Sequence, residues 1–393
     1  MDKKILDSEI QNFITHNIDK DVAKLALQKN PFPEINWIDI LNQIAAKSKV
    51  KEKLPTFFNT PNIIYPSKVS VEQTSSEKTA WYKSTIISGD TLVDLTGGFG
   101  VDDFYFSKKV KEVIHCEINA ELSEIVQHNF SILGASNIQC IAGDSLDILK
   151  TLNKKIDWIY IDPSRRNDAK GKVFMLKDCF PNVPELLEFY FSYTNSILVK
   201  TAPILDISAG LSELSNVKQI HIVAVENEVK ELLWELTKDF KGNPLIKTIN
   251  ITKGNMDTFN FELHSENTGV SFGLPKKYLY EPNSAIMKSG GFDVISSQYK
   301  IDKLHPHSHL YTADEIIDFP GRVFEIEKII PYSKTELKLY LENKKANITT
   351  RNFPDSVESI RKKWKIKDGG TMYCFFTTDM NNHKIVLICA KIN

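Results

Sequence analysis

The chain has 393 residues, of which 42% are hydrophobic and 25% charged, and its formal net charge is −1. This composition predicts a globular protein of two or three domains, and it excludes nucleic-acid binding through overall charge. No run of 18 apolar residues or signal-peptide pattern is present, and five cysteines without CxxC spacing indicate reduced thiols, so we expect a cytoplasmic protein without a membrane span.

The first 65 residues are expected to form a helical N-terminal region. Apolar side chains recur at helical spacings from residue 5 to about 50, and Pro31-Phe32-Pro33 interrupts them. An irregular segment follows between Leu54 and Pro66. The polar stretch 70–83 can be a surface helix with a capping box, or it can be a lid over a ligand, and the sequence leaves both interpretations open.

From residue 91 onward, short apolar runs alternate with amphipathic stretches. We expect strands at 91–94, 113–117, 138–141, 156–161, 196–200 and 219–225. We expect helices at 101–109, 119–133, 145–152 and 184–193, and a further helix through Leu232, Leu233 and Leu236. This alternation predicts an α/β domain over residues 66–268, with a parallel sheet between helices. The runs 247–251 and 258–264 are expected to add an antiparallel edge.

Residues 269–393 are expected to form a small α+β domain. Proline and glycine turns come first. The order that follows is β-α-β-α-β-β, with strands near 322–329, 346–350, 371–377 and 384–390 and helices at 334–344 and 355–364. That order has a ferredoxin-like character.

Acidic or glycine-rich residues follow each of the first four predicted strands. Asp94-Leu95-Thr96-Gly97-Gly98-Phe99-Gly100 ends the first strand, and such a turn brings bare backbone N–H groups to a ligand. Glu117 ends the second strand, where a carboxylate can accept hydrogen bonds from ribose hydroxyls. Asp144 ends the third, where it can accept from an adenine amino group, cap the next helix, or do both. Asp162-Pro163-Ser164-Arg165-Arg166 ends the fourth.

This series resembles the class I S-adenosylmethionine-dependent methyltransferases over residues 70 to 265. NAD-linked Rossmann proteins have a different glycine pattern and no Asp-Pro after strand four. The resemblance implies a Rossmann-like methyltransferase sheet with S-adenosyl-L-methionine as the cofactor. It assigns the ribose to Glu117 and the adenine end to Asp144. The remaining cofactor-binding residues that it implies are Asp94, Thr96, Gly97, Gly98, Gly100 and Asp162.

The Asp-Pro motif indicates where the methyl acceptor binds. Amino-methyltransferases carry Asp/Asn-Pro-Pro-aromatic there, whereas this chain has Ser164 and Arg165 after Asp162 and Pro163. Asp162 is the candidate to orient or deprotonate an acceptor, and Arg165 suits a phosphate, a stacked base or a carboxylate on the rim. Lys200, after strand five, can meet a phosphate or be solvated. The stretch 226–231 is expected to start a helix. Cys179 is expected to be structural.

The C-terminal part extends the resemblance to bacterial class I methyltransferases with a THUMP-like domain. The motifs are Tyr280-Glu281-Pro282-Asn283-Ser284-Ala285-Ile286-Met287-Lys288, Ala346-Asn347-Ile348-Thr349-Thr350-Arg351 and Lys367-Asp368-Gly369-Gly370. Ten Lys or Arg against five Asp or Glu over 341–393 fit RNA binding, and a solvated helix face explains the lysines as well. His305, His307 and His309 are expected in an ordinary turn, with no metal site.

The sequence thus predicts an S-adenosylmethionine-dependent methyltransferase that acts on a base nitrogen of rRNA or tRNA. Two alternatives stay open, namely a methyltransferase of proteins or small molecules and a non-catalytic RNA-binding protein that retains the cofactor fold. The sequence predicts neither the target nucleotide nor the oligomeric state.

Overall fold

The computed structural model describes residues 3–66, 68–152, 154–165, 175–264 and 269–392. The chain divides into two compact units. The first holds residues 1–220 and 230–242, and the second holds 221–229 and 243–393. The boundaries expected from the sequence instead follow residues 65 and 268, so residues 243–268, expected in the α/β domain, fall in the second unit.

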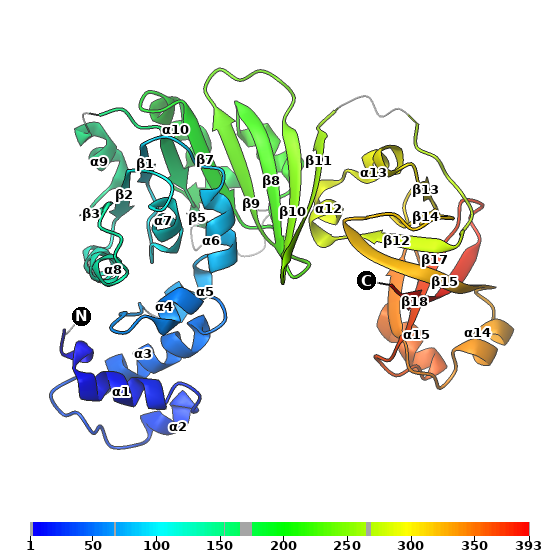
Figure 1. The fold of residues 1–393 in the computed structure, drawn as a ribbon, viewed down its shortest axis with the longest axis horizontal. Coiled ribbons are helices and arrows are strands. Elements are labelled where there is room, and N and C mark those ends of the chain that lie inside the picture. Colours follow the sequence, from blue (N-terminus) through cyan, green and yellow to red (C-terminus); the bar gives the residue numbers. More distant parts are fainter. Residues whose placement is uncertain (1–2, 67, 153, 166–174, 265–268, 393) are drawn as a thin grey trace. The chain divides into compact units, whose positions relative to one another are not determined.

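The first unit begins with short helices, as predicted (Figure 1). They are η1 (Lys3–Leu6), α1 (Ser8–His16), α2 (Val22–Ala26), α3 (Trp37–Val50) and α4 (Pro55–Asn59). Asp7, Asp21 and Asn36 each accept a backbone N–H at the start of α1, α2 and α3. The buried faces of α1 to α3 form one apolar cluster that includes Ile14 and Ile40.

The polar stretch before the first sheet strand forms two helices, α5 (Lys68–Gln73) and α6 (Glu77–Ser84). Ser76 caps α6, because its hydroxyl accepts the backbone N–H of Thr79 at 3.2 Å. A capped helix is therefore present, as in one of the two interpretations, but the stretch is broken at residues 74–76. The break places Ser75 between the two helices, where its side chain is buried.

The sheet of the first unit contains the parallel strands β1 (Thr91–Asp94), β2 (Glu112–Glu117), β3 (Ile138–Ala142), β4 (Trp158–Ile161) and β7 (Ser196–Thr201). Their order is β3-β2-β1-β4-β7, with β9 (Glu228–Thr237) beside β7. The helices between them are α7 (Val101–Phe106), α8 (Ala120–Ile132), α9 (Ser145–Thr151) and α10 (Val183–Phe191). The predicted α/β order is confirmed, and the carboxyl ends of β1, β2, β3 and β4 lie along one edge.

The region after the sixth predicted strand differs from the prediction. β8 (Val217–Val225) is followed by the strand β9, not by a helix through Leu232, Leu233 and Leu236. Glu226 and Asn227 have φ of 50° and 63°, which makes a tight hairpin turn, so 226–231 starts no helix. Both faces of β9 are covered from residue 231 to 236, so its apolar residues do not alternate and fit a helical pattern equally well.

The segment between β4 and β8 holds elements that the sequence did not predict. The short strand β5 (Ser164–Arg165) pairs with β6 (Cys179–Phe180), and η2 (Leu176–Asp178) precedes β6. Helix α11 (Ile207–Glu213) lies between β7 and β8 and begins at Asp206, which caps it.

The second unit contains the antiparallel pair β10 (Leu245–Thr252) and β11 (Asn255–Glu262), as predicted. A second sheet has the order β13-β14-β12-β15-β18-β17-β16. The predicted β-α-β-α-β-β order is confirmed by β15 (Gly321–Pro331), α14 (Lys334–Tyr340), β16 (Asn347–Arg351), α15 (Val357–Trp364), β17 (Met372–Thr378) and β18 (Lys384–Lys391). The elements not predicted are β12 (Tyr278–Pro282), α12 (Ser284–Ser289), α13 (Phe292–Tyr299), β13 (Asp302–Lys303) and β14 (Tyr311–Ala313).

Candidate functional site

The glycine turn after β1 lies tightly against neighbouring side chains. A Cβ on Gly97 would lie 2.1 Å from Cε1 of His115, and a Cβ on Gly100 would lie 2.4 Å from Cζ of Phe130. Gly98 and Gly100 also have φ of 56° and 76°, which L side chains rarely adopt. The turn therefore needs its glycines both for space and for backbone conformation.

Thr96 joins the ends of β1 and β4. Its hydroxyl accepts the backbone N–H of Asp162 at 2.7 Å and donates to Oδ1 of Asp94 at 3.1 Å. The same Asp94 oxygen accepts the Thr96 backbone N–H at 2.7 Å. Asp94 is almost fully buried, and this burial raises its pKa, with the nearby charge of Asp103 adding to the shift.

Glu117, at the end of β2, lies across the glycine turn. Its Oε2 accepts the Gly98 N–H at 3.0 Å, and its Oε1 accepts the Asn119 N–H at 2.8 Å. Each carboxylate oxygen has a second lone pair, so the carboxylate can still accept ligand hydroxyls. Asp144 caps α9 by accepting the N–H of Leu146 at 2.9 Å, which confirms its capping role.

Two hollows lie at these strand ends and share three residues, Thr96, Asp162 and Ser164. The first, of about 230 Å³, is bounded by the glycine turn and by Gln73, Thr74 and Ser75 between α5 and α6. The second, of about 250 Å³, is bounded by Glu117, Asp144, Phe180 and other residues. The sequence predicted that the acidic strand ends lie at this edge of the sheet. It did not predict that the space there is divided into two hollows that meet at Thr96 and Asp162.

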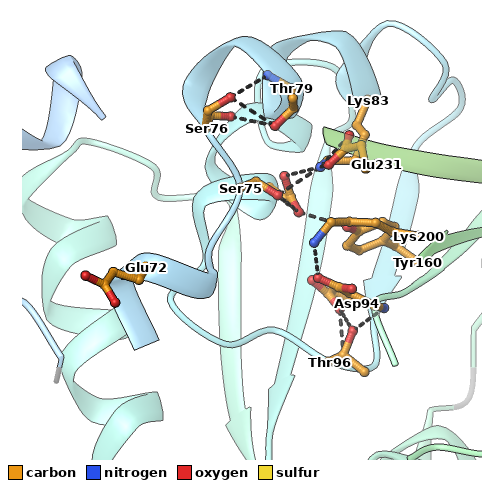
Figure 2. A network of polar contacts seen from close by, with 12 residues as sticks. Glu72, Ser75, Ser76, Thr79, Lys83, Asp94, Thr96, Tyr160, Lys200 and Glu231 are labelled. Carbon is orange, nitrogen blue, oxygen red and sulfur yellow. Dashed lines mark hydrogen bonds and ion pairs between the residues drawn. The ribbon is translucent and has the colours of Figure 1, made fainter. Parts of the chain in front are cut away.

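Beside the first hollow, a network of buried charges joins α6, α7, β7 and β9 (Figure 2). The ammonium of Lys83 is fully buried and donates to Ser75 Oγ at 2.9 Å and to Glu231 Oε2 at 2.8 Å. It also lies 3.1 Å from Oδ1 of Asp102, whose Oδ2 accepts from Tyr160 OH at 2.8 Å. Lys83, Asp102 and Glu231 had no assigned role, because elements remote in sequence bring them together.

Lys200 is neither solvated nor at an open rim. It forms an ion pair with Asp162, which corrects the expectation of a solvated lysine. Burial alone would lower the pKa of Lys200, but the negative charges of Asp162, Glu231 and Asp102 raise it above its usual value. Lys200 therefore stays charged and holds the Asp162 carboxylate at the point where the two hollows meet.

Burial and neighbouring charges act in opposite directions on the two carboxylates near Lys83. Burial raises the pKa of Glu231 above its usual value, although Lys83 and Lys200 oppose this shift. Burial also tends to raise the pKa of Asp102, but Lys83 and Lys200, with hydrogen bonds from Tyr160 and Ser75, hold it below its usual value.

A second buried polar group lies under the glycine turn. Nδ1 of His115 is 2.6 Å from Oδ2 of Asp103, and both side chains are fully buried. Burial lowers the pKa of His115 and, together with the charge of Asp102, raises the pKa of Asp103. His115 is the side chain that Gly97 leaves room for, so this pair supports the turn from below.

The remaining residues of the Asp-Pro motif are placed by β5. Pro163 is half-buried, and Ser164 and Arg165 belong to β5, where Arg165 pairs with Cys179 of β6. Arg166 lies outside the described residues. Cys179 is fully buried, and the five cysteines are free thiols.

In the second unit, the histidines at 305–309 form an ordinary turn, as expected. Nδ1 of His305 accepts the His307 backbone N–H at 3.1 Å and the Asn352 amide at 2.9 Å, while His309 stacks on Phe292. Among the described residues, no group of three or more His, Cys, Asp or Glu side chains can hold a metal ion. Within the same residues, no helix is long and apolar enough to cross a bilayer.

Comparisons with known proteins agree with this architecture. Residues 278–320 match a family described as a ferredoxin-like domain, and residues 321–391 match one described as THUMP domain-like. The sequence is 31% identical to that of a candidate methyltransferase from Porphyromonas gingivalis W83 with a known crystal structure. The two structures superpose over 100% of both chains with a TM-score of 0.89. The sequence is also 30% identical over 120 residues to an uncharacterized RNA methyltransferase of Clostridium acetobutylicum. The matched segment covers 30% of this chain and 25% of that protein.

The parallel sheet with a glycine turn after β1 and acidic residues at the next strand ends defines a Rossmann-like α/β protein of the class I methyltransferase type. The full-length match to the Porphyromonas gingivalis protein and the two C-terminal domain matches identify the family. The chain belongs to the bacterial class I methyltransferases with a C-terminal THUMP-like domain. It spans about a quarter of the length of the curated Clostridium relative.

Proposed function

We propose that this protein is an S-adenosylmethionine-dependent methyltransferase that methylates a base nitrogen of RNA, in rRNA or tRNA. The observation that carries the proposal is the pair of hollows that meet at Thr96, Asp162 and Ser164. One hollow has the glycine turn and the other has the two carboxylates, which is the arrangement that the two ends of this cofactor need.

The residues of the two hollows fit the cofactor chemically. In the second hollow, the free lone pairs of Glu117 can accept the ribose hydroxyls, and Asp144 can accept a hydrogen bond from the adenine amino group. Ile118 and Phe180 are 66% and 52% exposed there and can flank the base. The first hollow offers Gly97 and Gly98 to the amino-acid end. When bound, the cofactor supplies an electrophilic methyl group on a sulfonium.

Asp162 is the residue that we propose orients the acceptor. Its backbone N–H is held by Thr96 and its carboxylate by Lys200, so the side chain has little freedom to turn away. An ion-paired carboxylate accepts a hydrogen bond from an N–H of the acceptor, which directs the nitrogen lone pair toward the methyl carbon. With the cofactor bound, its sulfonium would supply the methyl group and leave as the thioether, and Asp162 or water would take the surplus proton of the acceptor nitrogen.

A lysine patch on the second unit supports RNA as the substrate. It consists of six exposed lysines, Lys344, Lys345, Lys362, Lys363, Lys365 and Lys367. Two of its loops are joined, since the N–H of Ala346 donates to the Lys367 carbonyl at 3.0 Å and the N–H of Lys367 donates to the Lys344 carbonyl at 2.9 Å. Such a cluster attracts a phosphate backbone.

The two neighbouring arginines are not part of the lysine patch. Arg351 donates to Glu281 at 2.9 Å, and Arg361 donates to Asp368 at 2.6 Å. Both arginines are among the ten basic residues counted over 341–393 in the sequence. Because they are paired with carboxylates, fewer basic side chains are available to RNA than that count indicated.

Calorimetric titration with S-adenosylhomocysteine tests the cofactor half of the proposal. We expect binding by the wild type and a loss of about 10- to 150-fold in Glu117→Ala, because a hydrogen bond to a charged group contributes about 1.5–3 kcal/mol. Glu124→Ala, an exposed glutamate on α8, is the matched control. No binding by the wild type, or unchanged binding by Glu117→Ala, contradicts the proposal.

Transfer of a labelled methyl group tests the substrate half. The purified protein is incubated with labelled S-adenosylmethionine and with total RNA or total protein from cells that lack it. We expect label in the RNA, and mass mapping of the labelled nucleotide then gives the methylated atom. Label in protein alone would favour the protein methyltransferase instead, and cofactor binding without any transfer would favour the non-catalytic alternative.

A further inference from the structure

A hollow of about 450 Å³ in the second unit has no place in the cofactor site. It lies between the end of β11, the α12–α13 junction and the segment that follows β13. Its volume is in the range that holds a small organic ligand or a nucleotide. Residues 289–309 supply most of its wall, and the sequence predicted only the turn at 305–309 among them.

One wall is an aromatic pair. The rings of Phe292 and His309 stack with centroids 3.6 Å apart and an interplanar angle of 20°. Burial, with the charges of Lys303 and Arg351, lowers the pKa of His309 to about 4, so the imidazole is neutral near pH 7. A neutral ring pair of this kind is a platform for another flat ring.

Nδ1 of His309 is buried and has no hydrogen-bond partner in the part of the chain that the structure describes. A buried polar atom without a partner is uncommon in folded proteins and needs a physical explanation. Because the ring lines the hollow, a polar edge of a bound ligand can supply the missing partner.

Another part of the wall is formed by Lys303 and the start of α13. Lys303 is 3% exposed, and its ammonium donates to Asp293 Oδ1 at 2.8 Å and lies 5.8 Å from the ring centroid of Phe292. Gly291 starts α13 without a side-chain cap, and the residues at this helix start line the hollow, although the N–H of Phe292 already donates to the Gly290 carbonyl at 2.8 Å. Asp293 and Glu262 also line the hollow, so two carboxylates stand there against one lysine, and that lysine is already paired with Asp293.

We propose that this hollow binds one unstacked nucleotide of the RNA substrate, with its base against the Phe292–His309 pair. The inference rests on the proposed RNA substrate. Proteins read single-stranded RNA by stacking splayed bases on aromatic rings and by bonding their polar edges. The hollow offers both features. Because of Asp293 and Glu262, inorganic phosphate alone is not expected to bind.

The test uses the full chain and two probes, the four nucleoside 5′-monophosphates and a single-stranded hexaribonucleotide of mixed sequence. Binding is measured by calorimetry and by the chemical shifts of the histidine rings. The variants are Phe292→Leu, which keeps the volume but removes the ring, and His309→Asn, which tolerates the φ of 52° at this position. The control is Lys338→Met, an exposed lysine on α14. Circular dichroism and thermal unfolding check that each variant folds.

We expect at least one mononucleotide and the hexaribonucleotide to bind the wild type. Folded Phe292→Leu and His309→Asn should weaken both by about 5- to 150-fold, the range of one base–aromatic stack. Lys338→Met should bind as the wild type does, and inorganic phosphate should produce no shift of the His309 signals.

Three results would overturn the inference. They are no binding of any nucleotide at millimolar concentration, equal affinity in the folded ring variants, or binding of free nucleotides with no effect of the ring variants on the hexaribonucleotide. These outcomes are independent of the proposed function. If the nucleotides bind as expected and total RNA takes no methyl label, the RNA methyltransferase proposal fails and the hollow stands as a nucleotide site. If RNA is methylated and the hollow is inert, only the inference fails.

Discussion

Replacing Lys83 with methionine should destabilise the first unit strongly. The ammonium is fully buried and makes hydrogen bonds or ion pairs with Ser75, Asp102 and Glu231, at 2.8 to 3.1 Å. Methionine keeps most of the side-chain volume and removes the charge. Asp102 and Glu231 would then face each other without a cation between them. Removing one partner of a buried ion pair costs about 3–5 kcal/mol, and we expect a loss of this size.

The loss should depend on pH. Burial already raises the pKa of Glu231 above its usual value of 4.5, and the loss of Lys83 removes the largest charge that opposes this shift. A carboxyl group whose pKa is raised in the folded state contributes stability that is present below its unfolded pKa and is lost as the pH rises through the folded pKa. The deficit of Lys83→Met should therefore be larger at pH 8 than at pH 5.

The assay is urea unfolding followed by tryptophan fluorescence. Trp234 is fully buried in β9 and hydrogen-bonded to Thr201 at 3.0 Å, so its emission reports on this part of the first unit. The double variant Lys83→Met/Glu231→Gln, which removes the unpaired carboxylate, should recover part of the loss at pH 8. A loss below about 1 kcal/mol at pH 8, or a deficit that does not shrink at pH 5, would refute the reasoning.

Three further predictions concern the glycine turn, the buried pair below it and the lysine patch. Gly97→Ala should lower the free energy of unfolding by about 1–3 kcal/mol and abolish S-adenosylhomocysteine binding in calorimetry, since its Cβ would lie 2.1 Å from His115. The Cβ of Gly98→Ala would meet nothing nearer than 3.7 Å, so this variant should lose only the roughly 1–2 kcal/mol that a left-handed backbone costs a non-glycine residue. Undiminished S-adenosylhomocysteine binding by Gly97→Ala would contradict the steric argument. In urea titrations, the stability of Asp103→Asn should approach or exceed that of the wild type as the pH rises from 5 to 9. The raised pKa of Asp103 makes the wild type lose stability as this carboxyl group ionises, by about 1.4 kcal/mol for each tenfold change in its acid dissociation constant, whereas asparagine cannot ionise. A stability difference that widens with pH would be inconsistent with burial of a neutral acid. In filter binding to tRNA, the triple variant Lys344→Gln/Lys345→Gln/Lys362→Gln should reduce the slope of the logarithm of the binding constant against the logarithm of the salt concentration by about 2. The control Lys338→Gln should leave this slope unchanged. An unaltered slope in the triple variant would exclude the lysine patch as the phosphate contact.

Most of the parallel sheet could be predicted because each strand and helix carries its own local pattern. β1 was predicted with the bounds that the structure has. Of the two roles that the sequence left open for Asp144, the structure confirms the helix cap. The error at β9 has a physical cause. A strand covered on both faces loses its alternation, and the Glu226–Asn227 hairpin has no glycine to mark it.

The sequence by itself determined the strand-end motif, because Asp94, the glycines, Glu117, Asp144 and Asp162 each follow a strand along the chain. Carboxyl ends of parallel strands meet at one edge, so local order was sufficient to bring them together. Only the tertiary structure decided that Lys200 holds Asp162 and that Lys83 lies between Asp102 and Glu231. Lys83 and Glu231 are 148 positions apart, and a buried ion pair leaves no local pattern in sequence, because the stability of each charge depends on a partner supplied by another element.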